Sequence, residues 1–499
     1  MNPHIDNFMK SFEYTGLTFD DVSLVTRYAD FLPNEADVST KFSRRITLNV
    51  PFVSAAMDTV TESKMAISMA IFGGIGVIHR NLEIERQADE VRVVKNYLHG
   101  LISDPVVFHP EQTVAEMLSE KEKRKYSFCG FPITESDGKL IGIITSRDIK
   151  FLTDYNVKLK SVMSSNLITA PEVSTLNDAF QIMVQNKIGK LPIVDREGHL
   201  TGLYSFHDVK TLIENNEPNY NRDKEHRLRV AAAIGTYDEE RAEALFQAKC
   251  DAIVIDTAHG HSKGVIETVK LLKGKYGDKI DVVAGNIATS EAAKDLLDAG
   301  ADALKIGIGP GSICTTRVVA GVGVPQLTAI YNSYKVVGEE VPLISDGGIR
   351  QSGDVGKILA TGASSVMMGS VLAGTKESPG EKIWHQGRTY VVYRGMGSLE
   401  AMKSSMSSRE RYGQSDVDDE NKIVPQGIEG MVLYRGEAQD VIFQFVGGLR
   451  YTLGYCGTRN IGELRKNARF VRVTSAGLRE AHPHDVKIIK DAPNYSVES

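Results

Sequence analysis

The chain has 499 residues, of which 42% are hydrophobic and 24% charged, and its formal net charge is −6. This length suits about three domains or one large barrel with an insertion. The charge gives no reason to expect nucleic acid or an anionic membrane as the main partner, and the absence of an apolar run of about 18 residues excludes a membrane-spanning helix.

The N-terminus and the cysteines bear on the compartment. Residues 1–6 contain no basic region followed by an apolar stretch, so we expect no signal peptide. The four cysteines (Cys129, Cys250, Cys314 and Cys456) are scattered without disulfide or metal-binding spacing. Both features predict a cytoplasmic protein.

The chain begins with an alternation of strands and helices. Strands are predicted at residues 50–57 and 76–79, and helices at 62–72 and 83–97. This alternation indicates βα units in a parallel sheet.

An internal repeat interrupts the alternation between residues 102 and 215. Residues 131–134 recur as 191–194, and residues 142–149 recur as 202–209, both at an offset of 60 residues. The two copies, at about 102–155 and 161–215, resemble CBS modules. A pair of such modules implies binding of regulatory adenine or guanine nucleotides.

Four residues of the repeat are candidates for ribose contacts. The resemblance to CBS modules implies these contacts for Thr145 with Asp148, and for Ser205 with Asp208. The alternative is that these side chains only cap the helices that follow them. Both interpretations stay open at this point.

A polar linker at 215–224 precedes a second run of βα units. Strands are predicted at 230–235, 252–256, 280–286, 303–308, 342–348 and 365–370, and helices at 238–248, 262–273, 290–299, 326–337 and 353–361. With the two early units this makes eight, which predicts a closed (β/α)8 TIM barrel with a tandem CBS (Bateman) module inserted after the second unit. The domains are then 1–101, 102–215 and 216–499.

Polar or glycine residues stand at the C-terminal end of nearly every predicted barrel strand. Barrels of this type carry their chemistry at that end. The residues are Met57, His79, Gly235, Asp256, Asn286, Gly307, Asp346 and Gly369.

The loop at 309–317 contains a candidate nucleophile. Glycines surround Cys314, and Arg317 follows it closely. Free backbone N–H groups and a nearby cation favour the reactive thiolate. The alternative is a small buried cysteine in a tight turn.

Two glycine-containing loops after the last strands predict a phosphate site. They are 346–348 and 369–370, where barrels bind phosphate through backbone N–H groups. Asp346 can accept both hydroxyls of a ribose. A third loop, 393–398, can lie along a base. The residues therefore predict a nucleoside monophosphate below the thiol of Cys314; the alternative is glycines that only permit turns.

A polar segment at about 399–430 predicts a mobile lid. It contains Arg409, Arg411 and Tyr412. Judged from the residues alone, such a charge cluster is typical of a solvated surface.

Taken together, the loop at 309–317, the segment 393–398, the Arg411–Tyr412 pair and the insertion resemble the IMP dehydrogenase family. The resemblance runs from about residue 17 to residue 486, and the phrase at 256–261 is of the bacterial type. It implies NAD-dependent oxidation of inosine 5′-monophosphate (IMP) to xanthosine 5′-monophosphate (XMP), a committed step of guanine nucleotide synthesis.

The resemblance also implies a mechanism in two stages. The Cys314 thiolate adds to carbon 2 of the base, and a hydride leaves for NAD. The lid then enters the vacated nicotinamide site, where Arg411 with Tyr412 activates water that Thr316 helps to position. The free pKa of arginine lies far above neutrality, so its role as a base rests on the resemblance alone.

The binding residues implied by the resemblance form three groups. Ser312, Gly347, Gly348, Gly369 and Ser370 would hold the phosphate, and Asp346 the ribose. The base and its surroundings would contact Met57, Tyr393, Arg394, Gly395, Met396, Gly397 and Gln426. NAD would face Asp256, Asn286, Gly307, Ile308 and Gly309.

A potassium ion is implied as well. Its ligands would be carbonyls of Gly309, Gly311 and Cys314, with Glu480, Ala481 and His482 of the partner subunit. Carbonyl oxygens suit a hard monovalent cation. This arrangement implies a homotetramer or a pair of tetramers forming an octamer.

The lid departs from the family pattern at two positions. Gly413 follows Tyr412 where the family often has an aromatic residue, and Arg409 is a second candidate base; Arg411 is preferred because it directly precedes the tyrosine. Three alternative functions remain: a GMP reductase, expected to lack the insertion and the Arg-Tyr lid; a CBS-based nucleotide-sensing regulator; and an unrelated phosphate-binding barrel enzyme.

Overall fold

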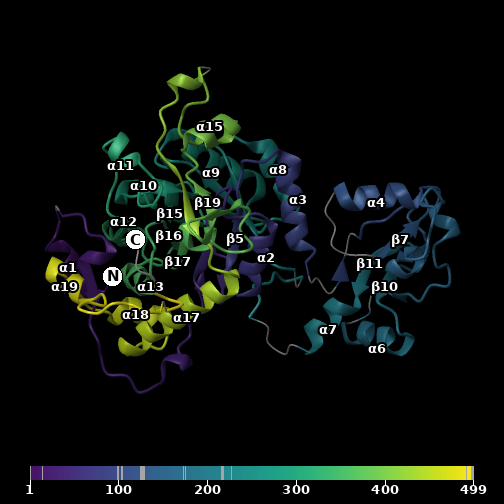
Figure 1. The fold of residues 1–499 in the computed structure, drawn as a ribbon, viewed down its shortest axis with the longest axis horizontal. Helices are drawn as coiled ribbons and strands as arrows, with labels where there is room; N and C mark the ends of the chain where they lie inside the picture. The colour runs from purple at the N-terminus through teal and green to yellow at the C-terminus, as the bar shows by residue number, and fades with distance from the viewer. Residues whose placement is uncertain are drawn as a thin grey trace. The chain divides into compact units, whose positions relative to one another are not determined.

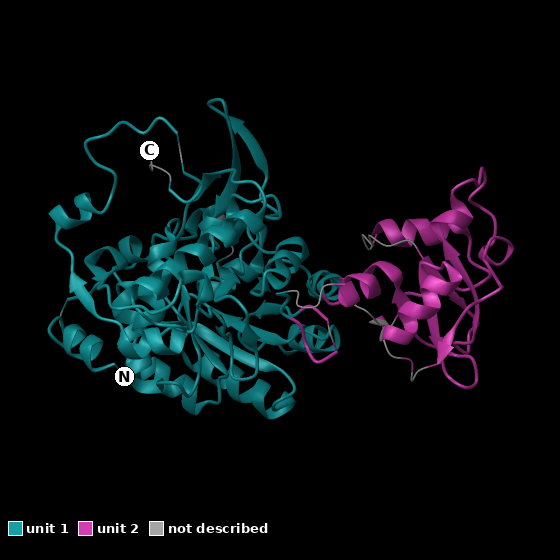
Figure 2. Ribbon diagram, turned by 90° about the horizontal axis from the view of Figure 1, so that it is seen from below, with its two compact units in different colours: residues 1–94, 219–221, 229–499 teal, residues 95–218, 222–228 magenta. Residues whose placement is uncertain are grey.

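The chain is described from a computed structural model that covers residues 2–13, 15–97, 101–102, 105–123, 130–171, 174, 176–214, 219–225, 227–417, 419–490 and 492–495. Cys129 and residues 215–218 of the predicted linker lie outside these ranges. The chain forms two compact units, shown in Figure 2: residues 1–94, 219–221 and 229–499, and residues 95–218 with 222–228.

The first unit is built on a closed parallel barrel, which confirms the predicted TIM barrel (Figure 1). Its strands are β4 (Phe52–Ser54), β5 (Ile75–Ile78), β12 (Ala231–Ile234), β13 (Ala252–Asp256), β14 (Asp281–Ile287), β15 (Ala303–Ile306), β16 (Leu343–Asp346) and β17 (Ser365–Met368). The barrel closes where β17 pairs with β4, with Val366 opposite Phe52.

The barrel strands form because they are short apolar runs buried on both faces, as parallel strands covered by helices require. Seven of the eight are buried along their whole length. Small and branched side chains such as Ala233, Val254 and Val283 fill the interior in one cluster.

Seven helices of the βα units lie in the outer ring: α2 (Ser63–Ile71), α3 (Ile84–Lys95), α8 (Glu239–Gln247), α9 (Lys263–Tyr276), α10 (Ser290–Asp298), α12 (Gln326–Val337) and α13 (Ser352–Thr361). The last strand is followed by the short helix α14 (Ser370–Ala373), and α17 (Ala438–Tyr455) packs against both α13 and α2. Helix α3 ends two residues before its predicted end, at Lys95, whose buried Nζ pairs with Asp223 at 3.1 Å.

Further elements surround the barrel. A three-stranded sheet consists of β18 (Lys382–His385), β19 (Arg388–Arg394) and β20 (Glu429–Leu433), and β1 (Val22–Leu24) pairs with β21 (Phe470–Arg472). The remaining helices are α1 (Pro3–Lys10), α11 (Thr316–Val319), α15 (Leu399–Ser404), α16 (Met406–Arg411), α18 (Ile461–Asn467) and α19 (Ser475–Glu480). No helix in the described ranges combines the length and apolar character that crossing a bilayer requires.

The second unit contains the sequence repeat in two structural copies. Strands β7 (Gly130–Thr134) and β8 (Leu140–Thr145) lead into α5 (Ser146–Ile149), and β10 (Lys190–Val194) and β11 (Leu200–Ser205) lead into α7 (Phe206–Glu214). The offset of 60 residues holds at the start of every one of these elements. The unit also contains β6 (Leu101–Ile102), α4 (Val114–Lys123), β9 (Ala170–Pro171) and α6 (Leu176–Asn186).

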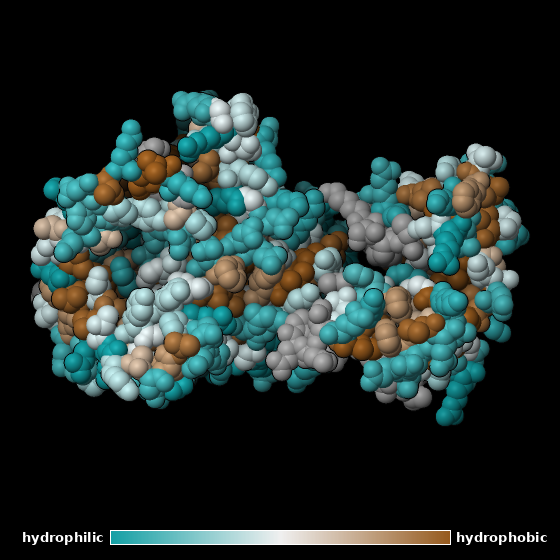
Figure 3. Space-filling view, turned by 60° about the horizontal axis from the view of Figure 1, so that its bottom comes forward, coloured by the Kyte–Doolittle hydropathy of each residue, from teal (hydrophilic) through white to brown (hydrophobic). Residues whose placement is uncertain are grey.

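Each copy has its own small apolar core. One core gathers around Phe108, Phe131 and Ile133, and the other around Leu191, Ile193 and Tyr204. On the outer surface, hydrophobic side chains are interspersed among hydrophilic ones on the face in Figure 3.

Candidate active site

The largest group of predicted site residues meets in one cavity at the C-terminal ends of the barrel strands, as expected for this fold. The predicted residues that line it are Met57, Asp256, Asn286, Gly307, Ile308, Gly309, Gly311, Ser312, Cys314, Thr316, Asp346, Gly347, Gly348, Gly369, Ser370, Tyr393, Gly395, Met396, Arg411, Tyr412 and Gln426. Residues that lie more than 350 positions apart in the sequence therefore line the same cavity.

Cys314 is partly exposed in the loop that follows β15. Its Sγ lies 3.2 Å from the hydroxyl of Thr316, with which it forms a hydrogen bond. Arg317 stabilises the loop by donating hydrogen bonds to the carbonyls of Ile308 (3.0 Å) and Val324 (2.6 Å). Gly309 has φ +73°, and a Cβ there would lie 2.7 Å from the Arg317 side chain. The glycine thus permits the packing that positions the thiol.

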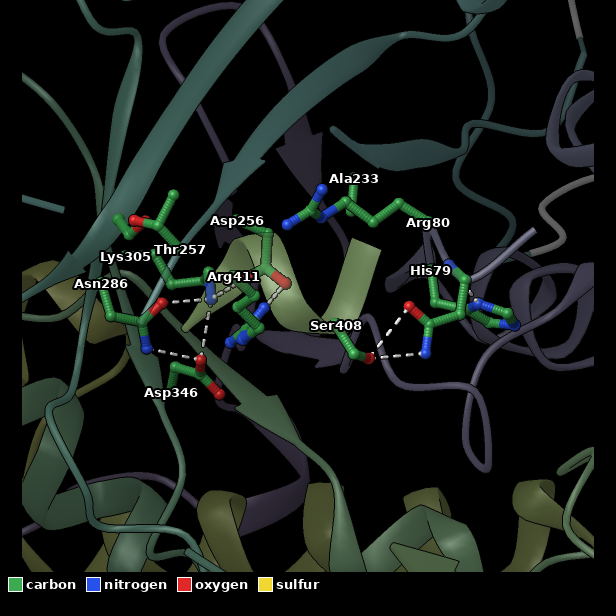
Figure 4. A network of polar contacts seen from close by, with 12 residues as sticks. His79, Arg80, Ala233, Asp256, Thr257, Asn286, Lys305, Asp346, Ser408 and Arg411 are labelled. Atoms are coloured by element: carbon green, nitrogen blue, oxygen red, sulfur yellow. Dashed lines mark hydrogen bonds and ion pairs between the residues drawn. The ribbon is translucent and has the colours of Figure 1, made fainter. Parts of the chain in front are cut away.

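A buried polar network lies beside the thiol loop (Figure 4). The ammonium of Lys305 donates to Asp256 (2.8 Å), to Asp346 (3.0 Å) and to the side-chain oxygen of Asn286. Asn286 in turn donates to Asp346 and to the carbonyl of Gly307, both at 2.8 Å. Lys305 is only 1% exposed. The lysine therefore joins the predicted ribose residue to two residues predicted to face NAD.

The sequence reasoning missed Lys305, although a signal was present. Strand β15 is otherwise apolar, and a lysine inside a buried strand is almost never fully buried unless it is paired. Thr257 and Ala258, which follow β13 and also line the cavity, were missed as well. Their side chains carry no comparable sequence signal.

The predicted lid closes over the cavity in this structure. Arg411, at the end of α16, forms an ion pair with Asp256, and its carbonyl accepts the N–H of Ala258 at 3.2 Å. A Cβ at Gly397 would lie 2.5 Å from the ring of Tyr412. Burial lowers the pKa of Arg411 and raises the pKa of Tyr412. The Arg411 side chain is 15% exposed, and its Nε has no hydrogen-bond partner among the described residues.

The other arm of the lid joins the thiol loop through backbone hydrogen bonds. The N–H of Thr315 donates to the carbonyl of Gln426, and the N–H of Ile428 donates to the carbonyl of Ile313, both at 3.0 Å. The N–H of Gln426 donates to the carbonyl of Gly397, also at 3.0 Å. The lid, the thiol loop and the segment 393–398 are thus one connected structure.

The predicted phosphate end of the cavity is formed by backbone that only glycine adopts easily. Gly347 and Gly348 have φ +90° and +80°, and a Cβ at either would contact Pro310. A Cβ at Gly369 would lie 2.7 Å from the hydroxyl of Tyr393. Burial raises the pKa of Tyr393 far above its ordinary value, so this hydroxyl stays protonated.

Five predicted residues lie outside the cavity lining. Arg394 forms a two-nitrogen ion pair with Asp58, with its closest contact at 2.7 Å, and Gly397 supports Tyr412 from behind. Glu480, Ala481 and His482, at the end of α19, are exposed to solvent.

The candidate ribose residues of the two copies in the inserted unit make different hydrogen bonds. In the first copy, Asp148 accepts the N–H (2.6 Å) and the hydroxyl (2.7 Å) of Thr145, as a capping residue does. In the second copy, no hydrogen bond from the described residues reaches Asp208, and burial raises its pKa to about 6. Among the described residues, the capping contact is therefore seen in the first copy.

Comparisons with known proteins agree with this geometry. Residues 16–484 match the family model described as an IMP dehydrogenase / GMP reductase domain. The inosine-5′-monophosphate dehydrogenase of Aquifex aeolicus is 54% identical, covering 97% of this chain and 98% of its own length. Those of Halalkalibacterium halodurans and Streptococcus pyogenes are both 50% identical, covering 97% and 99% of this chain and 99% and 100% of their own lengths.

A solved structure is also similar. It is a cysteine-to-alanine variant of the GMP reductase of Trypanosoma brucei, in complex with guanosine 5′-monophosphate. The TM-score is 0.85 and the identity 38%, with 96% of this chain and 100% of that chain covered. Coverage of this extent includes the inserted unit, so the expectation that GMP reductases lack the insertion is wrong for this relative.

Proposed function

Because the chain belongs to the IMP dehydrogenase / GMP reductase family, we propose that its barrel cavity oxidises IMP through a covalent bond to Cys314. The relatives at 50 to 54% identity are IMP dehydrogenases over nearly the full chain, and this chain is accordingly an NAD-dependent IMP dehydrogenase. The observation that carries the proposed mechanism is that Cys314, Arg411 and Tyr412 line one cavity with the phosphate-type glycines.

In the first stage, Cys314 forms the bond to substrate. Its thiolate adds to carbon 2 of the hypoxanthine ring, and carbon 2 then gives up a hydride. Bound NAD supplies the hydride acceptor. Asp256 and Asn286, both held by Lys305, form the wall that faces this second substrate. Hydride loss restores planarity at carbon 2, which remains bonded to sulfur.

In the second stage, water replaces the sulfur. The oxygen of water bonds to carbon 2, the carbon–sulfur bond breaks, XMP leaves and the Cys314 thiolate is regenerated. The net reaction converts IMP, NAD and water to XMP, NADH and a proton. Arg411 takes the proton from this water, with Tyr412 beside it and Thr316 orienting the water. Burial lowers the pKa of Arg411, whereas its ion pair with Asp256 favours the protonated form, so the role of base rests on the family resemblance.

The two stages use the space beside Asp256 in turn. Arg411 pairs with Asp256 while the lid is closed, so the lid and the nicotinamide end of the dinucleotide exclude one another there. Substrate stays in place because Ser312, Gly348, Gly369 and Ser370 hold its phosphate, with Gly347, and Asp346 holds its ribose. Met57, Tyr393, Gly395, Met396, Gly397 and Gln426 surround the base, while Gly307, Ile308 and Gly309 complete the NAD wall. Arg394 acts from outside this set, through Asp58.

A potassium ion fits the thiol loop. The carbonyls of Gly309 and Cys314 accept no hydrogen bond from the described residues, and the carbonyl of Gly311 accepts only the N–H of Cys314 at 3.1 Å. These oxygens would hold the cation, which supplies a fixed charge that keeps the loop in shape. Glu480, Ala481 and His482 of the partner subunit would complete the ligand set in a homotetramer or octamer.

The inserted unit is proposed to be a pair of CBS modules that bind regulatory adenine or guanine nucleotides. Asp208 and Ser205 are the stronger candidates for ribose contacts, because Asp148 and Thr145 already bond to one another.

The second candidate function, GMP reduction, is favoured by the GMP reductase structure. Spectrophotometry decides between the two. IMP, NAD and potassium are expected to produce NADH, whereas GMP with NADPH is expected to give no reaction. Cys314→Ala is expected to lose at least about 10³-fold in turnover, since no other group can form the covalent bond. Turnover equal to that of the parent would disprove the covalent mechanism.

A further inference from the structure

Arg80 is a buried cation next to the site that the mechanism so far leaves unused. It follows β5, whose neighbours in the barrel are β12 and then β13. The C-terminal ends of these three strands carry Arg80, Gly235 and Asp256. The Arg80 side chain is 5% exposed and extends toward Asp256 and Arg411 in Figure 4.

Within the described residues, the anion paired with Arg80 belongs to the lid. The Nη1 atom of Arg80 lies 2.9 Å from a carboxylate oxygen of Glu410 on α16. The neighbouring cation, Arg241, is already satisfied by Asp238 at 2.8 Å and Gln87 at 2.9 Å. When the lid opens and removes Glu410, Arg80 loses its ion-pair partner, and Asp238, which lies beyond ion-pair distance, is left as the other anion that acts on it.

The end of β12 leaves room for this pair. A Cβ at Gly235 would lie 2.7 Å from Nη1 of Arg80 and 3.4 Å from the Glu410 carboxylate. Any larger residue at Gly235 would displace one of the two charged groups. Glycine at position 235 thus lets a carboxylate oxygen approach the Arg80 guanidinium.

The next residue, Asn81, holds the same lid helix. Its amide donates to Ser408 and to Asp58, both at 3.0 Å, and its side-chain oxygen accepts from Ser405 at 3.0 Å. Arg80 and Asn81 together therefore dock the closed lid.

We propose that Arg80 exchanges anionic partners during each turnover, binding Glu410 when the lid is closed and the diphosphate of the dinucleotide when the lid is open. This inference rests on the proposed function, in which lid and dinucleotide occupy the space beside Asp256 in turn. The dinucleotide is the anion that the reaction itself brings to this space. Arg80 is then both a lid-positioning residue and a residue that binds the dinucleotide.

The two roles affect the apparent KM for NAD in opposite directions. Lid closure competes with NAD, so the apparent KM for NAD equals its intrinsic value divided by the fraction of enzyme whose lid is open. Glu410→Gln weakens closure without touching the dinucleotide, so it is expected to lower this KM a few-fold and to slow hydrolysis. Loss of Arg80 additionally removes a charge-assisted contact to phosphate, which is expected to raise the KM.

The test adds Arg80→Gln to the Glu410→Gln variant, where the lid pair is already absent. The KM for NAD is expected to be about tenfold higher in the double variant than in Glu410→Gln alone. A difference below about twofold would overturn the inference. Glu400→Gln, the same change at an exposed lid position, serves as the control and is expected to match the parent.

The Arg80→Lys variant tests whether the positive charge is what binds NAD, and the NADH burst of the parent enzyme tests the proposed function. Arg80→Lys retains the charge and is expected to keep the KM for NAD within about threefold of the parent while slowing hydrolysis; a tenfold rise in that variant would contradict a role for charge. A parent enzyme that forms no NADH burst with IMP would instead refute the proposed function. The two failures are therefore distinguishable.

Discussion

Carboxylates lie at or just after the C-terminal ends of strands in both units, but their partners differ. In the barrel, Asp256 and Asp346 share the buried ammonium of Lys305. In the inserted unit, Asp148 binds the backbone of its own turn, whereas Asp208 receives no such bond from the described residues. A position at the end of a strand therefore does not by itself make a carboxylate available to a ligand. Whether the carboxylate can bind a ligand depends on which partners the fold places beside it.

The largest effect on the barrel's activity is expected when Arg411, the lid residue that pairs with Asp256, is replaced. Arg411→Gln leaves Asp256 paired with Lys305 alone and removes the proposed base. We expect hydrolysis to slow by about 10³-fold, while the first turnover still yields a burst of NADH. Stopped-flow absorbance with quenched-flow trapping of the intermediate measures the two steps separately. Equal losses in both steps would mean that Arg411 acts before hydrolysis.

Removing the shared ammonium tests the barrel network itself. Lys305→Met leaves Asp346 without its counter-charge and leaves Asp256 with the lid's Arg411 as its remaining ion-pair partner among the described residues. We expect the barrel to lose about 3 kcal/mol or more in free energy of unfolding. Urea denaturation followed by circular dichroism measures this loss. A variant as stable as the parent would show that the two carboxylates bind protons or find other partners.

Removing the charge of Asp208, the half-buried carboxylate of the second repeat, is expected to stabilise its unit, whereas Lys305→Met is expected to destabilise the barrel. Burial raises the pKa of Asp208 to about 6, above its value near 4 in an unfolded chain. The folded state therefore binds the proton more tightly, and the unit loses stability as the pH rises from about 4 to about 6. Asp208→Asn is expected to stabilise the unit by about 1–2 kcal/mol at pH 7.5 and by little at pH 4.5.

Hydrogen exchange of peptides covering residues 190–214, taken as variant minus parent at each pH, measures that effect. The same substitution is expected to weaken binding of a regulatory nucleotide if Asp208 contacts its ribose. A stabilisation that is equal at both pH values would rule out titration of Asp208 as its cause.

The smallest effect is expected at the capping carboxylate of the first repeat. Asp148→Ala removes the bonds to Thr145 and is expected to destabilise the unit by about 1 kcal/mol. Nucleotide affinity is expected to stay unchanged, because Asp148 is engaged with its own turn. Isothermal titration with ATP or GTP checks this; weaker binding would give both copies the same role.

Much of the fold could be predicted from the sequence because each barrel strand is a short apolar run. All eight strands lie in or within one residue of their predicted ranges, and the repeat offset survives in the structure. The predicted strand at 303–308 ends early, since Gly307 has φ +148° and its carbonyl binds Asn286. Local pattern thus determines the elements.

The contacts between distant residues could not be predicted in the same way. The pairing of Lys305 with Asp256 and Asp346 exists only once the barrel has closed. The docking of Glu410 on Arg80 joins residues 330 positions apart, and neither residue has a sequence signal that points to the other. The family resemblance supplied the roles of Arg411 and Tyr412, while the geometry placed both in the cavity lining.

The pairing of β4 with β17, which closes the barrel, has a consequence for folding during synthesis. Val366 pairs with Phe52, so the first barrel strand meets its last partner only after 314 further residues have been synthesised. At ribosomal rates of roughly 5–20 residues per second, this takes about 15–60 s. During that time the inserted unit, with its own two cores, can fold within one nearly continuous stretch. The nascent barrel strands meanwhile expose apolar side chains, which makes this interval the period of greatest need for a chaperone.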